Sequence, residues 1–191
     1  MKNDPEFIIF TGPMFGSKTT RLLASIDRYR YQSKSIVAFK PKMDDRYSDV
    51  EIVTHSGGKL PAVGVNTGLD MLEYIKRSHE KFNVVAVDEA FMIEGVSDAL
   101  LSLFREGKTV VVSSLQLSAT GNVFEEVRDM MPWATKIEIC PAVCTVTGRD
   151  AYYTHRKFAG EEITVGGADL YEPRCWEFHS FMNAGELEGG R

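Results

Sequence analysis

The sequence predicts an α/β fold in which a mainly parallel sheet is covered by helices on both faces. Short, continuous apolar runs recur through the first two-thirds of the chain, and such runs are typical of strands buried on both faces. Segments with apolar residues at helical spacing separate these runs. Because strands that alternate with helices form βαβ units, the sheet is expected to be parallel.

The predicted elements follow one another in a regular order. The run Phe7 to Phe10 predicts the first strand, and Leu22, Ile26 and Tyr29 predict a helix from Thr19 to about Tyr31. The later elements are strands at 35–39, 83–87 and 109–112 and helices at 69–79 and 96–105, the last ended by a glycine at position 107. This α/β domain is expected to span residues 1–139.

The character of the chain changes near Cys140. From there the chain holds short β-like runs, glycines, aromatic residues and two of its three cysteines, so residues 140–182 are expected to form a smaller lobe. The last residues, 183–191, are rich in glycine and glutamate and are expected to be disordered.

Composition excludes several classes of protein. The formal net charge of the 191 residues is −5 with no basic run, which argues against a nucleic acid partner, because nucleic acid binding needs a basic footprint. No secretory signal and no apolar stretch of membrane-spanning length is present. Three cysteines do not suggest a disulfide framework. We therefore expect a cytoplasmic protein without a membrane partner.

The segment Gly12-Pro13-Met14-Phe15-Gly16-Ser17-Lys18-Thr19 follows a predicted strand and opens a predicted helix, as a P-loop does. Backbone N–H groups at such a helix N-terminus bind phosphate oxygens. Lys18 would reach the β- and γ-phosphates of ATP, and the Thr19 hydroxyl would coordinate Mg²⁺. The motif has glycine immediately before the lysine, but Ser17 stands there and Gly16 comes one residue early.

Two acids follow the predicted strand at 83–87. Asp88 and Glu89 stand where the carboxyl end of a parallel strand presents a Mg²⁺-holding carboxylate to a nucleotide. Because neighbouring side chains at a strand end point in different directions, Asp88 could face the metal while Glu89 faces an acceptor hydroxyl as general base.

With these segments in hand, the chain resembles the cytosolic (type II) thymidine kinases from about residue 7 to residue 181. The matching segments, in order, are Gly12-Pro13-Met14-Phe15, Asp44-Asp45-Arg46-Tyr47 with Thr54-His55, Asp88-Glu89-Ala90, Ala142-Val143-Cys144, Ala151-Tyr152-Tyr153-Thr154-His155-Arg156 and Gly166-Gly167-Ala168-Asp169-Leu170-Tyr171. Six ordered matches are more specific than any single motif.

The resemblance implies an ATP- and Mg²⁺-dependent kinase of thymidine with a RecA-like P-loop domain. It also implies a lasso-bearing, zinc-ribbon-like C-terminal lobe that closes over the nucleoside, and a homotetramer. Glu89 would be the catalytic base, and Asp44 and Arg46 would belong to the phosphate region. The nucleoside-contacting residues implied are Met14, Phe91, Leu115, Phe124, Glu162, Ile163, Thr164, Val165, Gly166 and Tyr171.

Departures from the family's pattern lie near the expected nucleoside pocket. Phe91 and Met92 stand where the family has glutamine and phenylalanine, and Ala119 stands where it has an aromatic residue. These changes either reshape the pocket toward a modified pyrimidine or deoxyuridine or are neutral exchanges among apolar residues.

The family's two C-x-x-C zinc pairs are incomplete. Cys144 and Cys175 match the first cysteine of each pair, but the second positions hold Thr147 and Phe178. Cys140 and His179 could complete a four-ligand zinc site with Cys144 and Cys175. Otherwise the thiols are packed, and Tyr152, Trp176 and Phe178 would stabilise the lobe.

Three functions are compatible with these features. The first is an active deoxynucleoside kinase, and the second is a catalytically impaired nucleotide-binding protein of the same fold, which Ser17 favours. The third is an ATPase acting on nucleic acid, which the net charge of −5 disfavours.

Overall fold

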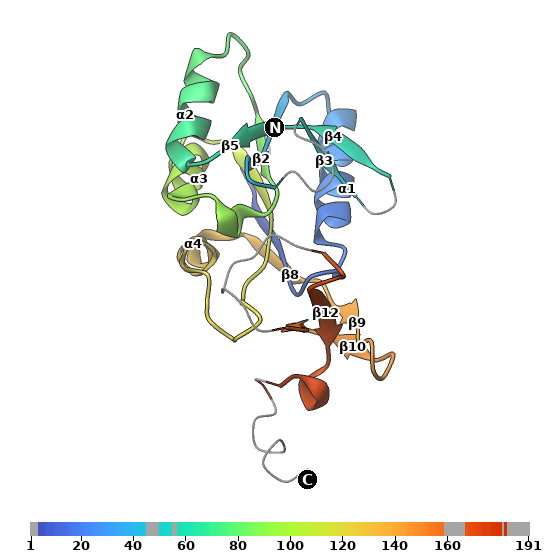
Figure 1. Cartoon of the computed structure of the whole chain (residues 1–191). Helices are drawn as coiled ribbons and strands as arrows, with labels where there is room; N and C mark the ends of the chain where they lie inside the picture. The colour runs from blue at the N-terminus through green and yellow to red at the C-terminus, as the bar shows by residue number, and fades with distance from the viewer. Residues whose placement is uncertain (1–3, 45–49, 55–56, 159–166, 181, 183–191) are drawn as a thin grey trace, which may run out of the picture.

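The computed structural model describes residues 4–44, 50–54, 57–158, 167–180 and 182. Within them, a parallel six-stranded sheet has the strand order β5-β2-β6-β7-β1-β8 (Figure 1). Its strands are β1 (Phe7–Thr11), β2 (Ile36–Pro41), β5 (Val63–Val65), β6 (Val84–Val87), β7 (Thr109–Ser114) and β8 (Lys136–Ile139). The α-helices are α1 (Lys18–Tyr31), α2 (Gly68–Arg77), α3 (Val96–Arg105) and α4 (Glu125–Met130).

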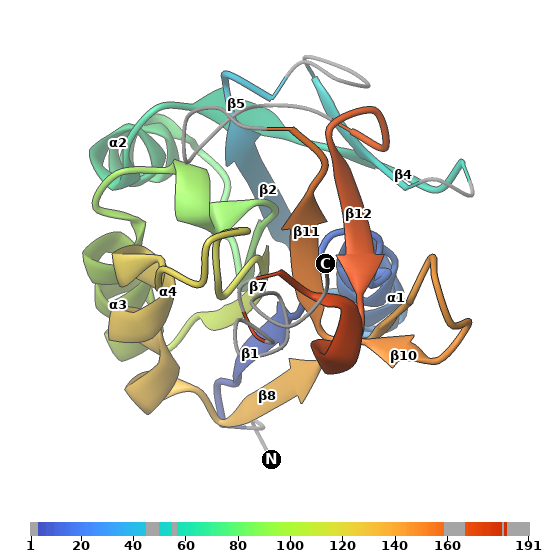
Figure 2. The same ribbon diagram turned by 60° about the horizontal axis from the view of Figure 1, so that its bottom comes forward.

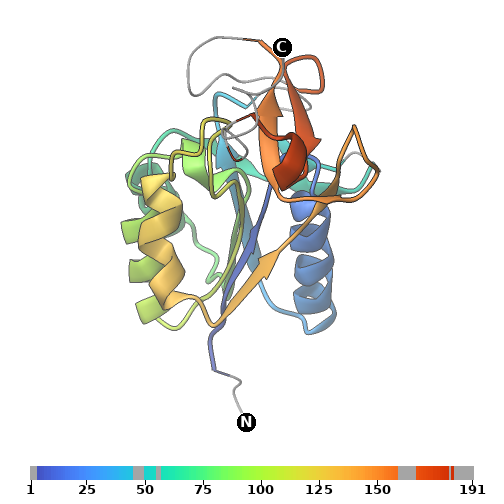
Figure 3. The same cartoon turned by 90° about the horizontal axis from the view of Figure 1, so that it is seen from below.

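Helices cover both faces of the sheet, so the predicted α/β class is confirmed. Figure 3 shows α1, in blue, on one side and α2, α3 and α4 on the other. Side chains alternate along β1 to match: Phe7 and Ile9 join the core under α2 and α3, while Ile8 and Phe10 join the core under α1. Burial on both faces explains why the strands read as continuous apolar runs.

Helices α1, α2 and α3 agree with the predicted ones except in detail, whereas α4 was not predicted. In α1, Leu22, Ile26 and Tyr29 are buried as expected. Leu69, in the first turn of α2, is 72% exposed, whereas Met71 is buried. No helix in the described part of the chain is both long and apolar enough to cross a membrane.

Strands β5 and β8 and the hairpin of β3 (Glu51–Val53) and β4 (Lys59–Pro61) have no counterpart among the predicted elements. Strand β8 lies at the sheet edge beside β1, and Ile137 and Ile139 are about half exposed there. An edge strand with alternating charged and apolar residues lacks the continuous apolar run by which the inner strands were found.

The chain from residue 142 onward forms short antiparallel ladders. Strand β9 (Ala142–Val143) pairs with β10 (Asp150–Ala151), and β11 (Tyr153–Arg156) pairs with β12 (Tyr171–Arg174). Figure 2 shows β11 and β12 in front of the sheet, and Figure 3 shows the same hairpin at the end opposite the start of β1. Since β1 and its parallel neighbours run toward this hairpin, it lies beside their carboxyl ends.

Candidate active site

The loop between β1 and α1 packs against the backbone that follows β8. A Cβ atom added to Gly12 or to Gly16 would lie 2.4 Å from the carbonyl oxygen of Cys140. Such a contact is too short for any side chain, so both positions require glycine. The glycine at position 16, one residue earlier than in the P-loop motif, is therefore explained by a contact with the neighbouring strand's end.

Ser17 occupies the backbone conformation for which glycine is usually chosen. Its φ is 58°, in the left-handed region, and its hydroxyl makes no capping hydrogen bond to α1. A residue with a Cβ pays about 1–2 kcal/mol in that conformation. Ser17 thus has the left-handed φ that the motif usually assigns to glycine, and its backbone is strained.

Opposite effects are expected from substitutions at these two neighbouring positions. Ser17→Gly should raise the free energy of unfolding by about 0.5–1 kcal/mol, because it removes the left-handed strain. Gly16→Ala should lower it by about 1–3 kcal/mol, because the new methyl group meets the Cys140 carbonyl. Urea unfolding measures both, and a stabilising Gly16→Ala would show that the loop does not pack as described.

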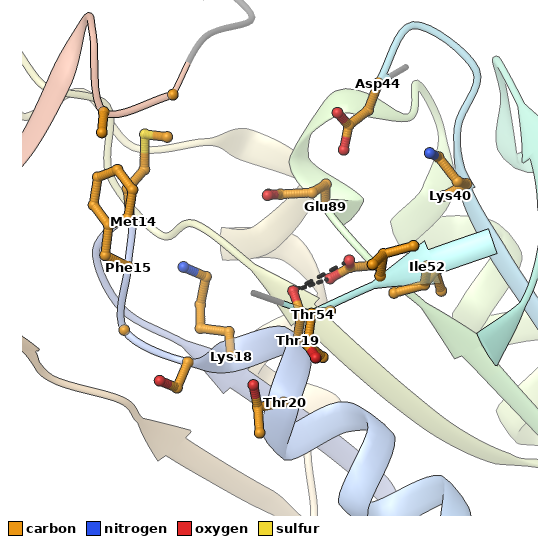
Figure 4. Close-up of a pocket in the computed structure, with 16 residues that line it drawn as sticks. Met14, Phe15, Lys18, Thr19, Thr20, Lys40, Asp44, Ile52, Thr54 and Glu89 are labelled. Carbon is orange, nitrogen blue, oxygen red and sulfur yellow. Dashed lines mark hydrogen bonds between the residues drawn. The ribbon is translucent and has the colours of Figure 1, made fainter. Parts of the chain in front are cut away.

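The helix N-terminus and the acidic strand end meet directly. The hydroxyl of Thr19 donates to both carboxylate oxygens of Asp88, over 3.1 and 3.2 Å (Figure 4). Ser113, from β7, donates a further hydrogen bond to Asp88. The ammonium of Lys18 donates to the Pro13 carbonyl over 2.6 Å, which holds it over the loop.

These side chains border one cavity of about 410 Å³. The described residues that line it are Met14, Phe15, Gly16, Ser17, Lys18, Thr19, Thr20, Lys40, Asp44, Ile52, Val53, Thr54, Asp88, Glu89, Gly167 and Ala168. The predicted P-loop, the acid pair and Asp44 are therefore brought together, with the β3–β4 hairpin as a further wall. Arg46, predicted beside Asp44, lies outside the described residues.

Asp88 is held in an environment that disfavours its charge. Burial is the main cause, the charge of Glu89 adds to it, and together they raise the pKa of Asp88 to about 7. Hydrogen bonds from Ser113 and Thr19 and the charge of Lys18 act in the opposite direction. A buried carboxylate beside a hydroxyl offers the hard oxygen ligands that Mg²⁺ prefers, so these residues fit that ion.

Glu89 begins a short 3₁₀ helix, η1 (Ala90–Met92), and has a left-handed backbone with φ 50°. This turn redirects the chain immediately after Asp88, and the Glu89 side chain lines the cavity, between Lys18 and Asp44 in the view of Figure 4. Strained residues of this kind cluster at functional sites. The division of roles expected for these two adjacent acids stays a prediction.

The predicted nucleoside-contacting residues are only partly assembled around the cavity. Met14 lines it, and Phe91, in η1, contacts Phe124 with ring centroids 4.5 Å apart and ring planes inclined by 40°. Leu115 is buried after β7. Tyr171 is buried in β12, where the Arg156 guanidinium lies 5.7 Å from its ring centre, and it is not among the cavity-lining residues. Residues 162–166 lie outside the described part of the chain.

Thr154 and Ser113 are site residues that the sequence did not reveal. The Thr154 hydroxyl accepts a hydrogen bond from the Met14 N–H over 3.0 Å, which ties the loop to β11. The buried His179 holds the same residue through a 2.8 Å contact between its Nε2 and the Thr154 carbonyl oxygen. Because Met14 and Thr154 are 140 positions apart, no local pattern could signal this contact.

The four-ligand zinc alternative is wrong for this structure. Cys140 packs in the core under α1, whereas Cys144 and Cys175 pack with Ala151 in a separate small cluster. His179 is committed to Thr154. Among the described residues, no three His, Cys, Asp or Glu side chains gather in a way that could hold a metal ion. Tyr152, Trp176 and Phe178, expected to stabilise this region instead, are between 41% and 57% exposed.

Hydrogen bonds surround the Cys144 thiol. Burial raises its pKa, but hydrogen bonds from the Thr147 hydroxyl and from backbone amides, including that of Cys175, outweigh burial and lower the pKa to about 6. Purified protein is therefore expected to carry well under one zinc ion per chain, and EDTA should leave its Tm unchanged. Stoichiometric zinc by elemental analysis, with a Tm that falls in EDTA, would contradict this.

Fold and site together define a class: an α/β protein in which a glycine-dependent loop opens a helix opposite a buried acid pair, an arrangement suited to a phosphate-bearing ligand. The chain belongs to the thymidine kinase family, whose model matches residues 6–179. It is 35% identical over 181 residues to a thymidine kinase of Thermococcus kodakarensis, covering 90% of this chain and 92% of that protein. It is 33% identical over 176 residues to a thymidine kinase of Pyrobaculum aerophilum, covering 88% and 95%.

Proposed function

We propose that this protein transfers the γ-phosphate of ATP to the 5′-hydroxyl of thymidine or a related pyrimidine deoxynucleoside. Membership of the thymidine kinase family and the names of the two relatives support this activity. The observation that carries the proposal is that Lys18, Asp88 and Glu89 border the same cavity. No described feature favours the impaired binding protein, because the strained loop conformation is retained at Ser17.

The triphosphate would lie over the loop at the N-terminus of α1. The loop's backbone N–H groups would bind phosphate oxygens, and Lys18 would exchange its contact with the Pro13 carbonyl for a phosphate oxygen. Thr19 and Asp88 would hold Mg²⁺, which when bound neutralises part of the phosphate charge. Since the protein would supply only these two ligands, phosphate oxygens and water would complete the ion's coordination.

Glu89 would act on the acceptor. Its carboxylate would accept the proton of the 5′-hydroxyl as that oxygen bonds to the γ-phosphorus and the bond from phosphorus to the β-phosphate oxygen breaks. ADP would leave with the electron pair of that bond. The left-handed turn at Glu89 separates its side chain from that of Asp88, so that one acid serves the metal and the other serves the acceptor.

The nucleoside would lie between the η1 region and the C-terminal part of the chain. The contacting rings of Phe91 and Phe124 would offer an aromatic face to a pyrimidine. We propose that residues 162–166 and Tyr171 close over it, as the lasso of the predicted lobe, residues 140–182. The family resemblance further supports a cytoplasmic homotetramer, which gel filtration with light scattering tests directly.

One transfer assay tests the function. Purified protein, Mg²⁺ and γ-labelled ATP are incubated separately with thymidine, deoxyuridine, deoxycytidine, deoxyadenosine and deoxyguanosine. Label is expected on thymidine, and transfer to deoxyuridine measures how far the pocket around Phe91 tolerates loss of the 5-methyl group. ATP bound without transfer to any nucleoside would contradict the proposal, and so would hydrolysis stimulated by DNA.

A further inference from the structure

A second buried lysine borders the cavity, and neither the P-loop motif nor the resemblance draws attention to it. Lys40, the residue before the last in strand β2, is 6% exposed and lines the same 410 Å³ cavity as Lys18. Lysine is almost never this deeply buried unless negative charge surrounds it. The burial of Lys40 therefore needs an explanation.

Strand register places Lys40 beside the acid pair. Phe39 pairs with Val87 across β2 and β6, and the N–H of Asp88 donates to the Phe39 carbonyl over 3.0 Å. Ala38 and Ala86 both join the core under α1. Because side chains alternate along strands, Lys40 and Asp88, each two residues further on, project to that same side of the sheet. That is the side where α1 and its phosphate-binding loop lie.

The turn after β2 brings an acid back over this lysine. The Asp44 N–H donates to the Pro41 carbonyl over 3.1 Å, which folds the chain so that Asp44, 8% exposed, enters the cavity. Figure 4 shows the side chains of Lys40 and Asp44 near each other, on the side of Glu89 away from Lys18. Lys40 is thus oriented into the cavity rather than toward solvent.

The balance of charge in the cavity indicates a role for this lysine. Among the described lining residues, three acids (Asp44, Asp88 and Glu89) face two cations (Lys18 and Lys40). A triphosphate adds about four negative charges and its Mg²⁺ offsets only two of them, so the cavity is short of positive charge when substrate binds. Lys18 approaches from the loop, and Lys40 stands on the opposite side, next to the acceptor's base.

We propose that Lys40 is a second phosphate-binding cation, which contacts the γ-phosphoryl group from the side opposite Lys18 and stabilises the charge that develops during its transfer. The proposal rests on the kinase activity proposed above for the catalytic arm of its test, but its binding arm is independent of any nucleoside. A contact to the γ-phosphate, rather than to the α- or β-phosphate, follows from the position of Lys40 on the Glu89 side of the cavity.

The test compares Lys40→Met with Lys42→Met, an exposed lysine two residues further on that does not line the cavity. Calorimetry measures the Kd of β,γ-imido-ATP and of ADP, each with Mg²⁺. Lys40→Met is expected to raise the Kd of the ATP analogue about 10-fold or more. The Kd of ADP should change by less than about twofold, because only the analogue carries a γ-phosphoryl group. The kcat of this variant should fall about 10²–10³-fold with an unchanged KM for thymidine. Lys42→Met should change none of these.

A purely structural lysine gives a different result. Equal loss of affinity for both nucleotides, or a lowered Tm with unchanged ATP-over-ADP preference, would overturn the proposal. Lys40→Arg, which keeps the charge, is expected to recover part of that preference. If the unmodified protein phosphorylates no nucleoside but Lys40→Met still loses the preference, the thymidine kinase activity fails and the role of Lys40 stands.

Discussion

Replacing Glu89 by glutamine is expected to lower kcat for thymidine phosphorylation by about 10²–10⁴-fold, the usual contribution of a general base. The amide keeps the size of the side chain but cannot accept the 5′-hydroxyl proton. Nucleotide binding should be unchanged, because Lys18, Thr19 and Asp88 are untouched. Steady-state kinetics and calorimetry with β,γ-imido-ATP separate the two effects.

The control for Glu89→Gln is Glu94→Gln, which removes an exposed carboxylate five positions further along. It should leave kcat within about twofold, as surface changes usually do. If Glu89→Gln retained its activity, another group would have to act as the base. The left-handed turn at Glu89 would then have no catalytic explanation. Loss of nucleotide affinity along with kcat would mean that Glu89 binds the metal rather than the acceptor.

Local signals in the sequence were sufficient for the inner strands β1, β2, β6 and β7 and for helices α1, α2 and α3. The run Phe7 to Phe10 and the strand ending at Asp88 are apolar because both faces are covered, so they could be recognised without the fold. Leu69 is exposed because it lies off the buried face of α2, which carries Gly68 and Met71. Trp133, at the end of the short helix η2 (Met131–Trp133), is 51% exposed.

The residues of the site likewise fall into those that local motifs reveal and those that only the fold reveals. Lys18, Thr19, Asp88 and Glu89 belong to two short motifs, so sequence alone could name them. Contacts between distant segments left no such trace: Ser113 reaches Asp88 across 25 positions, and the Cys140 carbonyl fixes where the loop's glycine must stand. Lys40 is one lysine among 22 basic residues until the register of β2 and β6 places it in the cavity.

Asp88→Asn is expected to change activity and stability in opposite directions. Activity should fall by about 10³-fold or more, because the carboxylate that would hold Mg²⁺ is lost. The protein without metal or nucleotide should become more stable at pH 8 by about 1–3 kcal/mol, since a buried charge facing Glu89 is removed. The amide can still bond with the hydroxyls of Thr19 and Ser113, so no buried group need lose its partner.

The pH dependence of this stabilisation follows from the raised pKa. In the folded protein Asp88 has a pKa of about 7, against an ordinary value of 3.8 in the unfolded chain, so between these values the folded state binds more protons. The destabilisation by Asp88 is therefore absent below about pH 4, grows as the pH rises and is complete above about pH 7. Tm measured in EDTA at pH 5 and pH 8 should show a gain from Asp88→Asn that is larger at pH 8.

Asp150→Asn, at an exposed position in β10, is the control and should shift Tm equally little at both values of pH. An Asp88→Asn variant that is less stable at every pH would mean that the carboxylate is a structural partner of Thr19 and Ser113. The expected result means instead that the fold carries an unfavourable charge in order to present it to a cation. Mg²⁺ with ATP should then raise the Tm of the unmodified protein more than that of the variant, since binding to the folded state stabilises it.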